Sequence, residues 1–248
     1  MTGIAGGWAE VQALIAAEPP GVEDKAGVVG WLQRLCRAAV RALPARGVGV
    51  SVLSESGEQV TVAASDPASE AIEELQFTLG EGPCLDAYAG RRPVLTSNLA
   101  GEAMTRWPGY SPTAQARGVR AVFAFPLQIG AARLGALDVY RDRPGALSTR
   151  ALHLALTFAE VAMAILLDAQ ERSGAADDPV GGRGEPLDDP LDDRAELWQA
   201  QGMVMIQLGV SMIEAMARLR AYAYAQDRRL SDVARDVVAR KLRLEHDP

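Results

Sequence analysis

The chain has 248 residues, of which 48% are hydrophobic and 23% charged, and its formal net charge at pH 7 is −7. This length exceeds the usual size of one domain, so we expect two domains; the net acidity argues against a nucleic-acid-binding surface that covers the whole chain. Two cysteines, Cys36 and Cys84, are too few for a disulfide framework, which excludes a small secreted scaffold held by disulfides.

The amino terminus has no charged head followed by a long apolar run, so we expect no secretory signal. The most apolar stretch, Leu152 to Leu167, is interrupted by His153, Thr157 and Glu160. By its length we expect it to be too short to span a bilayer. We therefore expect a cytoplasmic protein that has no membrane partner.

The first predicted elements follow an N-terminal extension over residues 1–22. Helical periodicity predicts a helix from Val28 to Leu43, which ends before Pro44. Two runs of alternating apolar and polar residues come next, Gly47 to Ser54 and Glu58 to Ser65. The short turn between them predicts a β-hairpin.

A second hairpin is predicted from the runs Val119 to Ile129 and Arg133 to Tyr140, which are joined around Gly130. Short helical stretches and a loop lie between the two hairpins. A last helix begins at Ser148, which can cap it, and runs to about Gln170. Two hairpins separated by a helix-rich insertion and flanked by helices predict an α+β fold with an antiparallel sheet.

Residues 23–170 resemble a GAF domain, the relative of the PAS fold that senses small molecules or other signals. The resemblance is carried by GEGPCLDA from Gly80 to Ala87, by FPL from Phe125 to Leu127 and by LGALDVY from Leu134 to Tyr140. It implies a GAF-like antiparallel sheet with flanking helices, and it allows a small-molecule ligand. The identity of such a ligand, and of any cofactor, is not given by the sequence.

The loop around the second cysteine contains the candidate ligand-binding residues of this part. In one interpretation the loop forms a wall of a pocket, where its glycines let the backbone turn tightly beside a ligand. In the other it is a structural turn that caps the next helix. We expect no catalytic residue, and no metal site because His153 and His246 lack metal-ligand spacing. The candidate ligand-binding residues are Gly80, Glu81, Gly82 and Cys84.

An acidic stretch comes next, and we assign residues 171–191 to it. The segment from Glu171 to Asp193 holds eight acidic residues and two arginines, together with glycines and prolines. A loop of this length inside one compact domain is uncommon. We therefore expect a solvated linker between two domains.

Three amphipathic segments follow within residues 192–246, and each is apolar on one side only. Gly209 separates the first two, and the polar residues 226–229 separate the second and third. Ser211, three residues before Glu214, predicts a capping box at the start of the second. Because each stripe must be buried, the helices are expected to close into a three-helix bundle, with small residues where backbones approach. The stripes are Leu197, Ala200, Val204, Met205 and Leu208; Met212, Ala215, Met216, Leu219, Tyr222 and Ala223; and Leu230, Val233, Ala234, Val237 and Val238; the small residues are Ala200, Gly202, Ala215, Ala223 and Ala234.

This arrangement resembles the ANTAR domain, an RNA-binding antitermination module of many bacterial signalling proteins. The resemblance is carried by AQGMVM from Ala200 to Met205 and by the joint spacing of the second and third stripes. It implies an ANTAR-like RNA-binding domain. Together with the GAF-like part, it implies a signal-responsive regulator that promotes transcription antitermination by binding stem-loops of leader RNA, and not an enzyme.

Charge is distributed unevenly along the chain, because nine basic and five acidic residues lie between Arg194 and Arg243. Basic side chains gathered on a small module are typical of a phosphate-binding surface, although any solvated helix can carry such charges. Arg194 and Gln201 are seven residues apart and share a face, where the amide can bond a base edge. The predicted RNA-binding residues are Arg194, Gln201, Arg218, Arg220, Tyr222, Arg228, Arg229, Arg240 and Lys241.

The residues on the second helix leave alternatives open. Arg218 and Tyr222 lie on neighbouring turns, whereas Arg220 points elsewhere. Tyr222 also lies on the apolar stripe, so it is either an RNA contact or part of the core. Arg240 and Lys241 are expected to act through general electrostatics.

Two other functions are compatible with the sequence. The short connection between the second and third helices allows a helix-turn-helix that binds DNA. One GAF branch reduces free methionine sulfoxide with thiols, which would need a resolving thiol near Cys84, and Cys36 lies on the opening helix. The last GAF-like helix is apolar nearly all round, so we also expect a homodimer formed through the helices near residues 28–43 and 150–168.

Overall fold

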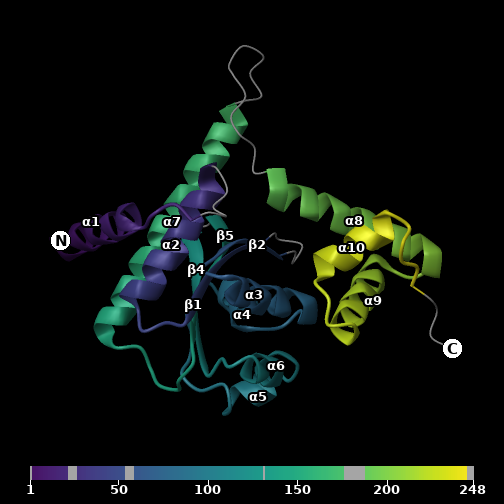
Figure 1. Ribbon diagram of the computed structural model, residues 1–248, viewed down its shortest axis with the longest axis horizontal. Helices are drawn as coiled ribbons and strands as arrows, with labels where there is room; N and C mark the ends of the chain where they lie inside the picture. The colour runs from purple at the N-terminus through teal and green to yellow at the C-terminus, as the bar shows by residue number, and fades with distance from the viewer. Residues whose placement is uncertain (1, 22–26, 54–58, 131, 176–187, 245–248) are drawn as a thin grey trace. The chain divides into compact units, whose positions relative to one another are not determined.

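The computed structural model describes residues 2–21, 27–53, 59–130, 132–175 and 188–244 (Figure 1). The chain divides into two compact units. The main segments are Met1–Phe77 and Glu81–Pro186 in the first and Leu187–Pro248 in the second. Each unit buries apolar side chains of its own, and we describe each by itself.

The first unit is built on a five-stranded antiparallel sheet with the strand order β2-β1-β5-β4-β3. Both predicted hairpins are confirmed as neighbouring pairs, β1 with β2 and β4 with β5, and pairing of β1 with β5 joins them. The backbones of β1 and β5 approach closely at Gly135, where a Cβ would lie 1.9 Å from the Ser51 carbonyl oxygen. The strands are β1 Gly47–Leu53, β2 Gln59–Ala64, β3 Val94–Thr96, β4 Ala121–Ile129 and β5 Ala132–Arg141.

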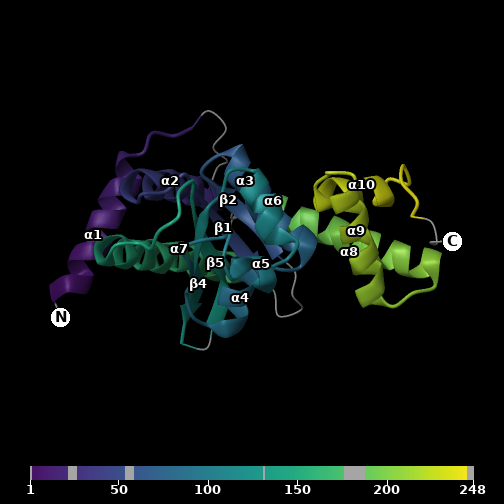
Figure 2. The ribbon, with the colours of Figure 1, turned by 90° about the horizontal axis from the view of Figure 1, so that it is seen from below.

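Helices cover both faces of the sheet (Figure 2). On one face α2 packs on β1 and β2, and α7 packs on β4 and β5; on the other face α4 packs on β3, β4 and β5. Cover on both sides explains why β4 is buried along most of its length instead of alternating. The helices of this unit are α1 Thr2–Ala17, α2 Gly27–Ala42, α3 Pro67–Leu79, α4 Pro83–Gly90, α5 Ala103–Arg106, α6 Tyr110–Ala116 and α7 Thr149–Ala175.

The predicted N-terminal extension contains a helix that the sequence patterns did not indicate. This helix, α1, packs on α2 and α7. It buries Val11 and Ile15, and the indole N–H of Trp8 donates to a carboxylate oxygen of Glu160 on α7 at 3.2 Å. Part of the apolar surface of α7 is therefore covered by a helix of the same unit.

The cap of α7 is confirmed, because the Ser148 hydroxyl accepts a hydrogen bond from the N–H of Ala151 at 3.2 Å. The helix is longer than predicted and ends at Ala175. Its stretch Thr149–Gln170 extends beyond the predicted apolar segment and has the length and composition of a membrane-crossing helix, a test that buried core helices also pass. Within the first unit this helix buries Ala155, Phe158, Ala162, Met163 and Leu166.

The second unit is the predicted three-helix bundle of α8 (Asp188–Leu208), α9 (Met212–Ala225) and α10 (Leu230–Val238), in which each helix packs on the other two. The chain bends by 105° between α8 and α9, and Gly209 has a φ of +61° at this bend. The Ser211 hydroxyl accepts from the N–H of Glu214 at 3.2 Å, so the predicted N-cap is present. The core is Leu197, Ala200, Val204, Leu208, Ala215, Met216, Leu219, Ala223, Leu230, Val233, Ala234, Val237 and Leu244.

Two expectations about the bundle were wrong. Met212 was placed on a buried stripe, but it is 52% exposed because it is the first residue of α9, at the edge of the bundle. Gly202 was expected at a close approach of two backbones, but no atom of another part of the chain lies within 4 Å of the place where its Cβ would be.

The helices α7 and α8 extend into the range assigned to the linker, and residues 176–187 lie outside the described part of the chain.

Candidate functional site

The first unit contains a cluster of polar side chains that is buried between the sheet and the helices α3, α4 and α6. Asp138 and Tyr140 are two residues apart on β5 and so face the same side of the sheet. Glu73 and Gln76 are three residues apart on α3 and so share a helix face. We call this set the polar cluster; it consists of Ser51, Glu73, Gln76, Cys84, Tyr110, Asp138 and Tyr140, all of them buried.

A glycine on β1 makes room for the cluster. Gly49 pairs with Asp138 across the β1–β5 ladder, and a Cβ at Gly49 would lie 2.2 Å from a carboxylate oxygen of Glu73. Heavy atoms that are not bonded do not approach so closely. The absence of a side chain at this position therefore lets α3 bring Glu73 onto the sheet.

Hydrogen bonds join most of the cluster into one network. The hydroxyls of Ser51 and Tyr140 donate to the two carboxylate oxygens of Glu73, at 2.7 and 2.6 Å. The side-chain amide of Gln76 donates to Asp138 Oδ2 at 2.6 Å. The Gln76 carbonyl oxygen accepts from the backbone N–H of Cys84 at 2.8 Å, which holds the start of α4 against α3.

The two carboxyl groups of the cluster have unusual acidity. Burial raises the pKa of Asp138 well above its ordinary value, and the neighbouring Glu73 raises it further. Burial also raises the pKa of Glu73 to about 7, against the hydrogen bonds from Tyr140 and Ser51, which lower it. A proton is therefore retained on the carboxyl pair at pH values where exposed carboxyl groups are ionised.

The predicted ligand-binding loop contributes to this region in two different ways. Cys84 joins the polar cluster. Glu81 instead accepts hydrogen bonds from the backbone N–H groups of Gly109 and Tyr110, at 2.6 and 2.8 Å, and so ties the loop to α6. Gly80 and Gly82 have positive φ angles, and the turn that they make leads into α4.

The cluster residues outside the loop were missed by the reasoning from sequence. Asp138 gave the clearest signal, since it is a charged residue in the middle of the apolar strand LGALDVY. Glu73 and Gln76 gave no such signal. They follow the apolar residues Ile72 and Leu75 on α3, and no pattern had been assigned to that helix from the sequence. A buried carboxylate in a strand needs a partner, and this requirement could have directed attention to the neighbouring helix.

Burial and nearby carboxylates make the two thiols poor nucleophiles. Burial raises the pKa of Cys36 and of Cys84 above the usual range of a thiol, and the charge of nearby carboxylates raises both further. Reactive cysteines need a lowered pKa and exposure. Cys36 lies on α2 and Cys84 on α4, and both are free thiols. These surroundings argue against a thiol-dependent reductase.

In the second unit, several predicted RNA-binding residues are engaged within the bundle. The side-chain amide of Gln201 donates to the carbonyl oxygen of Met212 at 2.8 Å and so links α8 to α9. Arg218 pairs with Glu214 at 3.2 Å on α9, and Arg228 pairs with Asp236 at 2.6 Å. Binding a phosphate through either arginine therefore requires it to exchange a carboxylate for the phosphate.

The other predicted contacts differ in exposure. Arg229, Arg240 and Lys241 are exposed, Arg229 just before α10 and the other two just after it. Tyr222 is half-buried on α9, between the two alternatives given for it. Arg220 is two residues beyond Arg218 and points to a different side of α9. Arg194 lies within α8, and its side chain is outside the described part of the structure.

Two exposed aromatic residues of the bundle were not among the predicted contacts. Trp198 on α8 is 53% exposed, and Tyr224 on α9 is 49% exposed. Helical spacing places Trp198 on the same face of α8 as Gln201. That spacing was visible in the sequence and could have identified Trp198.

Comparisons with known proteins agree with this architecture. The GAF domain family model matches residues 29–198, and the ANTAR domain family model matches residues 185–238. No curated protein matches the chain in sequence.

Two solved GAF domains are similar in structure to part of this chain. The GAF domain of an Acinetobacter phosphoenolpyruvate-protein phosphotransferase has 13% identity and a TM-score of 0.52, over 70% of this chain and 99% of that one. The GAF domain of a phosphoenolpyruvate-protein phosphotransferase from Coxiella burnetii has 14% identity and a TM-score of 0.52, over 69% and 96%. At these identities the likeness shows the GAF fold alone.

Proposed function

Because the chain belongs to the GAF domain family and also carries an ANTAR domain, we propose that it is a signal-responsive regulator that binds structured leader RNA and promotes transcription antitermination. A GAF domain is a sensory domain, and an ANTAR domain is an RNA-binding antitermination module. The pair indicates a sensory regulator and not an enzyme. In this proposal residues 23–170 form the sensor, 171–191 the linker and 192–246 the RNA-binding domain.

The observation that supports RNA binding most directly is an exposed aromatic ring on a helix face that also carries a polar residue. Trp198 shares its face of α8 with Gln201, and Arg194 precedes Trp198 by four residues in the sequence. Proteins read an RNA hairpin mainly at its loop, where unstacked bases stack on aromatic rings while nearby cations hold phosphates. We propose that Trp198 stacks on a loop base and that Arg194 contacts a phosphate beside it.

The test is binding of the full chain to RNA hairpins with randomised loops, followed by fluorescence anisotropy on the selected hairpin and on duplex DNA of the same sequence. Trp198→Ala should weaken hairpin binding by about 1–3 kcal/mol, which is roughly fivefold to 150-fold. Ile213→Ala is the matched control, because Ile213 is an apolar side chain of the same bundle with 85% exposure. Equal binding of parent and Trp198→Ala would contradict the proposed face.

DNA binding is the second candidate. It is favoured by the short connection between α9 and α10 and by the exposed Arg240 and Lys241 after α10. The same experiment separates the two functions. Tighter binding of duplex DNA than of any selected hairpin would replace the RNA proposal with a DNA-binding one.

We also propose that the protein acts as a homodimer through α2 and α7. Trp31 on α2 is 50% exposed, although α2 is otherwise strongly amphipathic. A dimer would bury this ring, and aromatic residues are enriched in protein interfaces. Light scattering at micromolar concentration should give the mass of two chains, and Trp31→Glu should give the mass of one. A monomer in the parent protein would contradict this proposal.

A further inference from the structure

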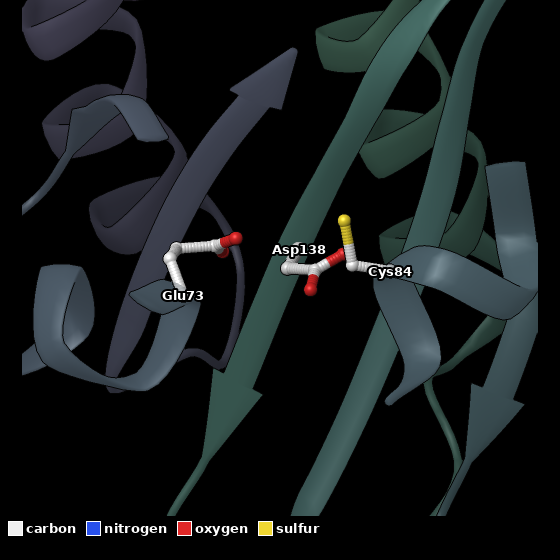
Figure 3. A group of neighbouring side chains, drawn as sticks. All are labelled: Glu73, Cys84 and Asp138. Carbon is white, nitrogen blue, oxygen red and sulfur yellow. The ribbon is translucent and has the colours of Figure 1, made fainter. Parts of the chain in front are cut away.

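Three potential metal-ligand atoms lie together inside the sensor unit. Glu73 from α3, Cys84 from α4 and Asp138 from β5 each offer one donor atom, and these three atoms lie within 4.8 Å of one another (Figure 3). All three side chains are fully buried. Three separate elements of the fold therefore bring two carboxyl groups and a thiol to one place.

The same place contains polar atoms that the described residues leave without a partner. Asp138 Oδ1 and the hydroxyl of Tyr110 are buried and have no hydrogen-bond partner among the described residues. Burial raises the pKa of the Tyr110 hydroxyl well above its ordinary value, and the charges of Asp138, Glu73 and Cys84 raise it further. Buried polar atoms in proteins are nearly always satisfied, and each one that is not costs about 1–3 kcal/mol.

The cluster also contains no basic side chain that balances its acids. Among the described residues, neither Glu73 nor Asp138 forms an ion pair with a lysine or an arginine. Buried charges in proteins are paired or coordinate a metal. A proton retained on the carboxyl pair reduces this charge, and a cation small enough to lie among the three donor atoms can take the place of that proton.

We propose that Glu73, Cys84 and Asp138 bind a divalent transition-metal ion. The sulfur atom decides the class of cation, because Mg²⁺ and Ca²⁺ take oxygen ligands whereas Zn²⁺ and its first-row neighbours also take thiolate. Binding requires the Cys84 thiol proton, and any proton held by the carboxyl pair, to leave to solvent. Three protein ligands leave a coordination position for water or a signal molecule.

Binding of the ion has a structural consequence for the sensor. Its ligands come from α3, α4 and β5, so the ion holds both helices against the sheet. Coupling of this event to RNA binding rests on the proposed function, whereas the metal site itself does not. If the protein binds the metal ion but does not bind RNA, the metal site is established and the proposed regulatory function is wrong.

The test is a titration of the full chain, stripped with a chelator, with Co²⁺ as the probe. A thiolate bound to Co²⁺ gives an intense near-ultraviolet charge-transfer band, which we expect to saturate at one ion per chain and to disappear on addition of Zn²⁺. Cys84→Ser should abolish the band, and Asp138→Asn and Glu73→Gln should each weaken binding at least tenfold. Cys36→Ser is the matched control, since it removes the other buried thiol, and it should keep the band.

Folding of each variant is checked by circular dichroism in the presence of a chelator. Measurements on the parent protein alone provide a second test that does not depend on folding of the variants. In the parent protein Zn²⁺ should raise the Tm. In urea at a concentration below the unfolding midpoint, Zn²⁺ should also protect one cysteine from alkylation, and peptide mapping should identify this residue as Cys84. Absence of a charge-transfer band in the parent, its persistence in Cys84→Ser, or protection of Cys36 instead of Cys84 would overturn the proposal.

Discussion

Stability of the sensor unit should fall as the pH rises from 5 to 8, and Glu73 should be a main cause. Burial raises the pKa of Glu73 from 4.5 to about 7, so the folded protein holds this proton more tightly than the unfolded chain does. The resulting stabilisation is fully present below pH 4.5 and is lost as the pH rises through 7. At 1.36 kcal/mol for each pKa unit, it amounts to roughly 3 kcal/mol, shared with the coupled Asp138.

The measurement is urea unfolding at pH 5 and pH 8 in the presence of a chelator, with hydrogen exchange of β1 and β5 used to isolate the sensor transition. Glu73→Gln should remove much of the pH dependence, because an amide keeps the shape but does not titrate. Glu74→Gln changes the neighbouring, half-buried position of α3 and should keep the dependence. A parent free energy of unfolding that is constant or rises over this range would refute the reasoning.

Three further changes test the packing and the RNA surface. Gly49→Ala places a Cβ 2.2 Å from a buried carboxylate oxygen and should destabilise the sensor by about 1–3 kcal/mol in urea unfolding; an unchanged midpoint would contradict the fit described here. Gly202→Ala meets no atom within 4 Å and should stabilise the bundle by about 0.5–1 kcal/mol, seen as a higher Tm. Ser211→Ala removes the cap of α9 and should cost about 1 kcal/mol by the same measurement.

The order of the elements could be predicted from the sequence because it depends on local patterns. The two hairpins show alternation of apolar and polar residues, and the bundle helices show a spacing of three and four. The pairing of β1 with β5 was not visible in this way, because no local pattern records which strands of two hairpins become neighbours. The helix α1 was missed since its apolar residues form only a weak stripe.

The polar cluster could not be predicted for a different reason. Glu73 and Asp138 are separated by more than sixty positions in the chain, and each on its own is an ordinary acidic residue. Their significance arises from the tertiary contact that places both beside Cys84. The loop that carries Cys84 was identified from its glycines, so one part of the site was visible while its partners were not.

The ion pairs of the bundle change what the count of basic residues means for RNA binding. Arg218 and Arg228 already pair with Glu214 and Asp236, and moving either arginine to a phosphate would leave a carboxylate near the negatively charged RNA. Exchange of one anion for another therefore contributes less than a new contact by a cation that has no carboxylate partner. Exposed side chains such as Arg240 do not have to break these pairs. Affinity should therefore depend more on the exposed cations and on Trp198 than the local excess of basic residues suggests.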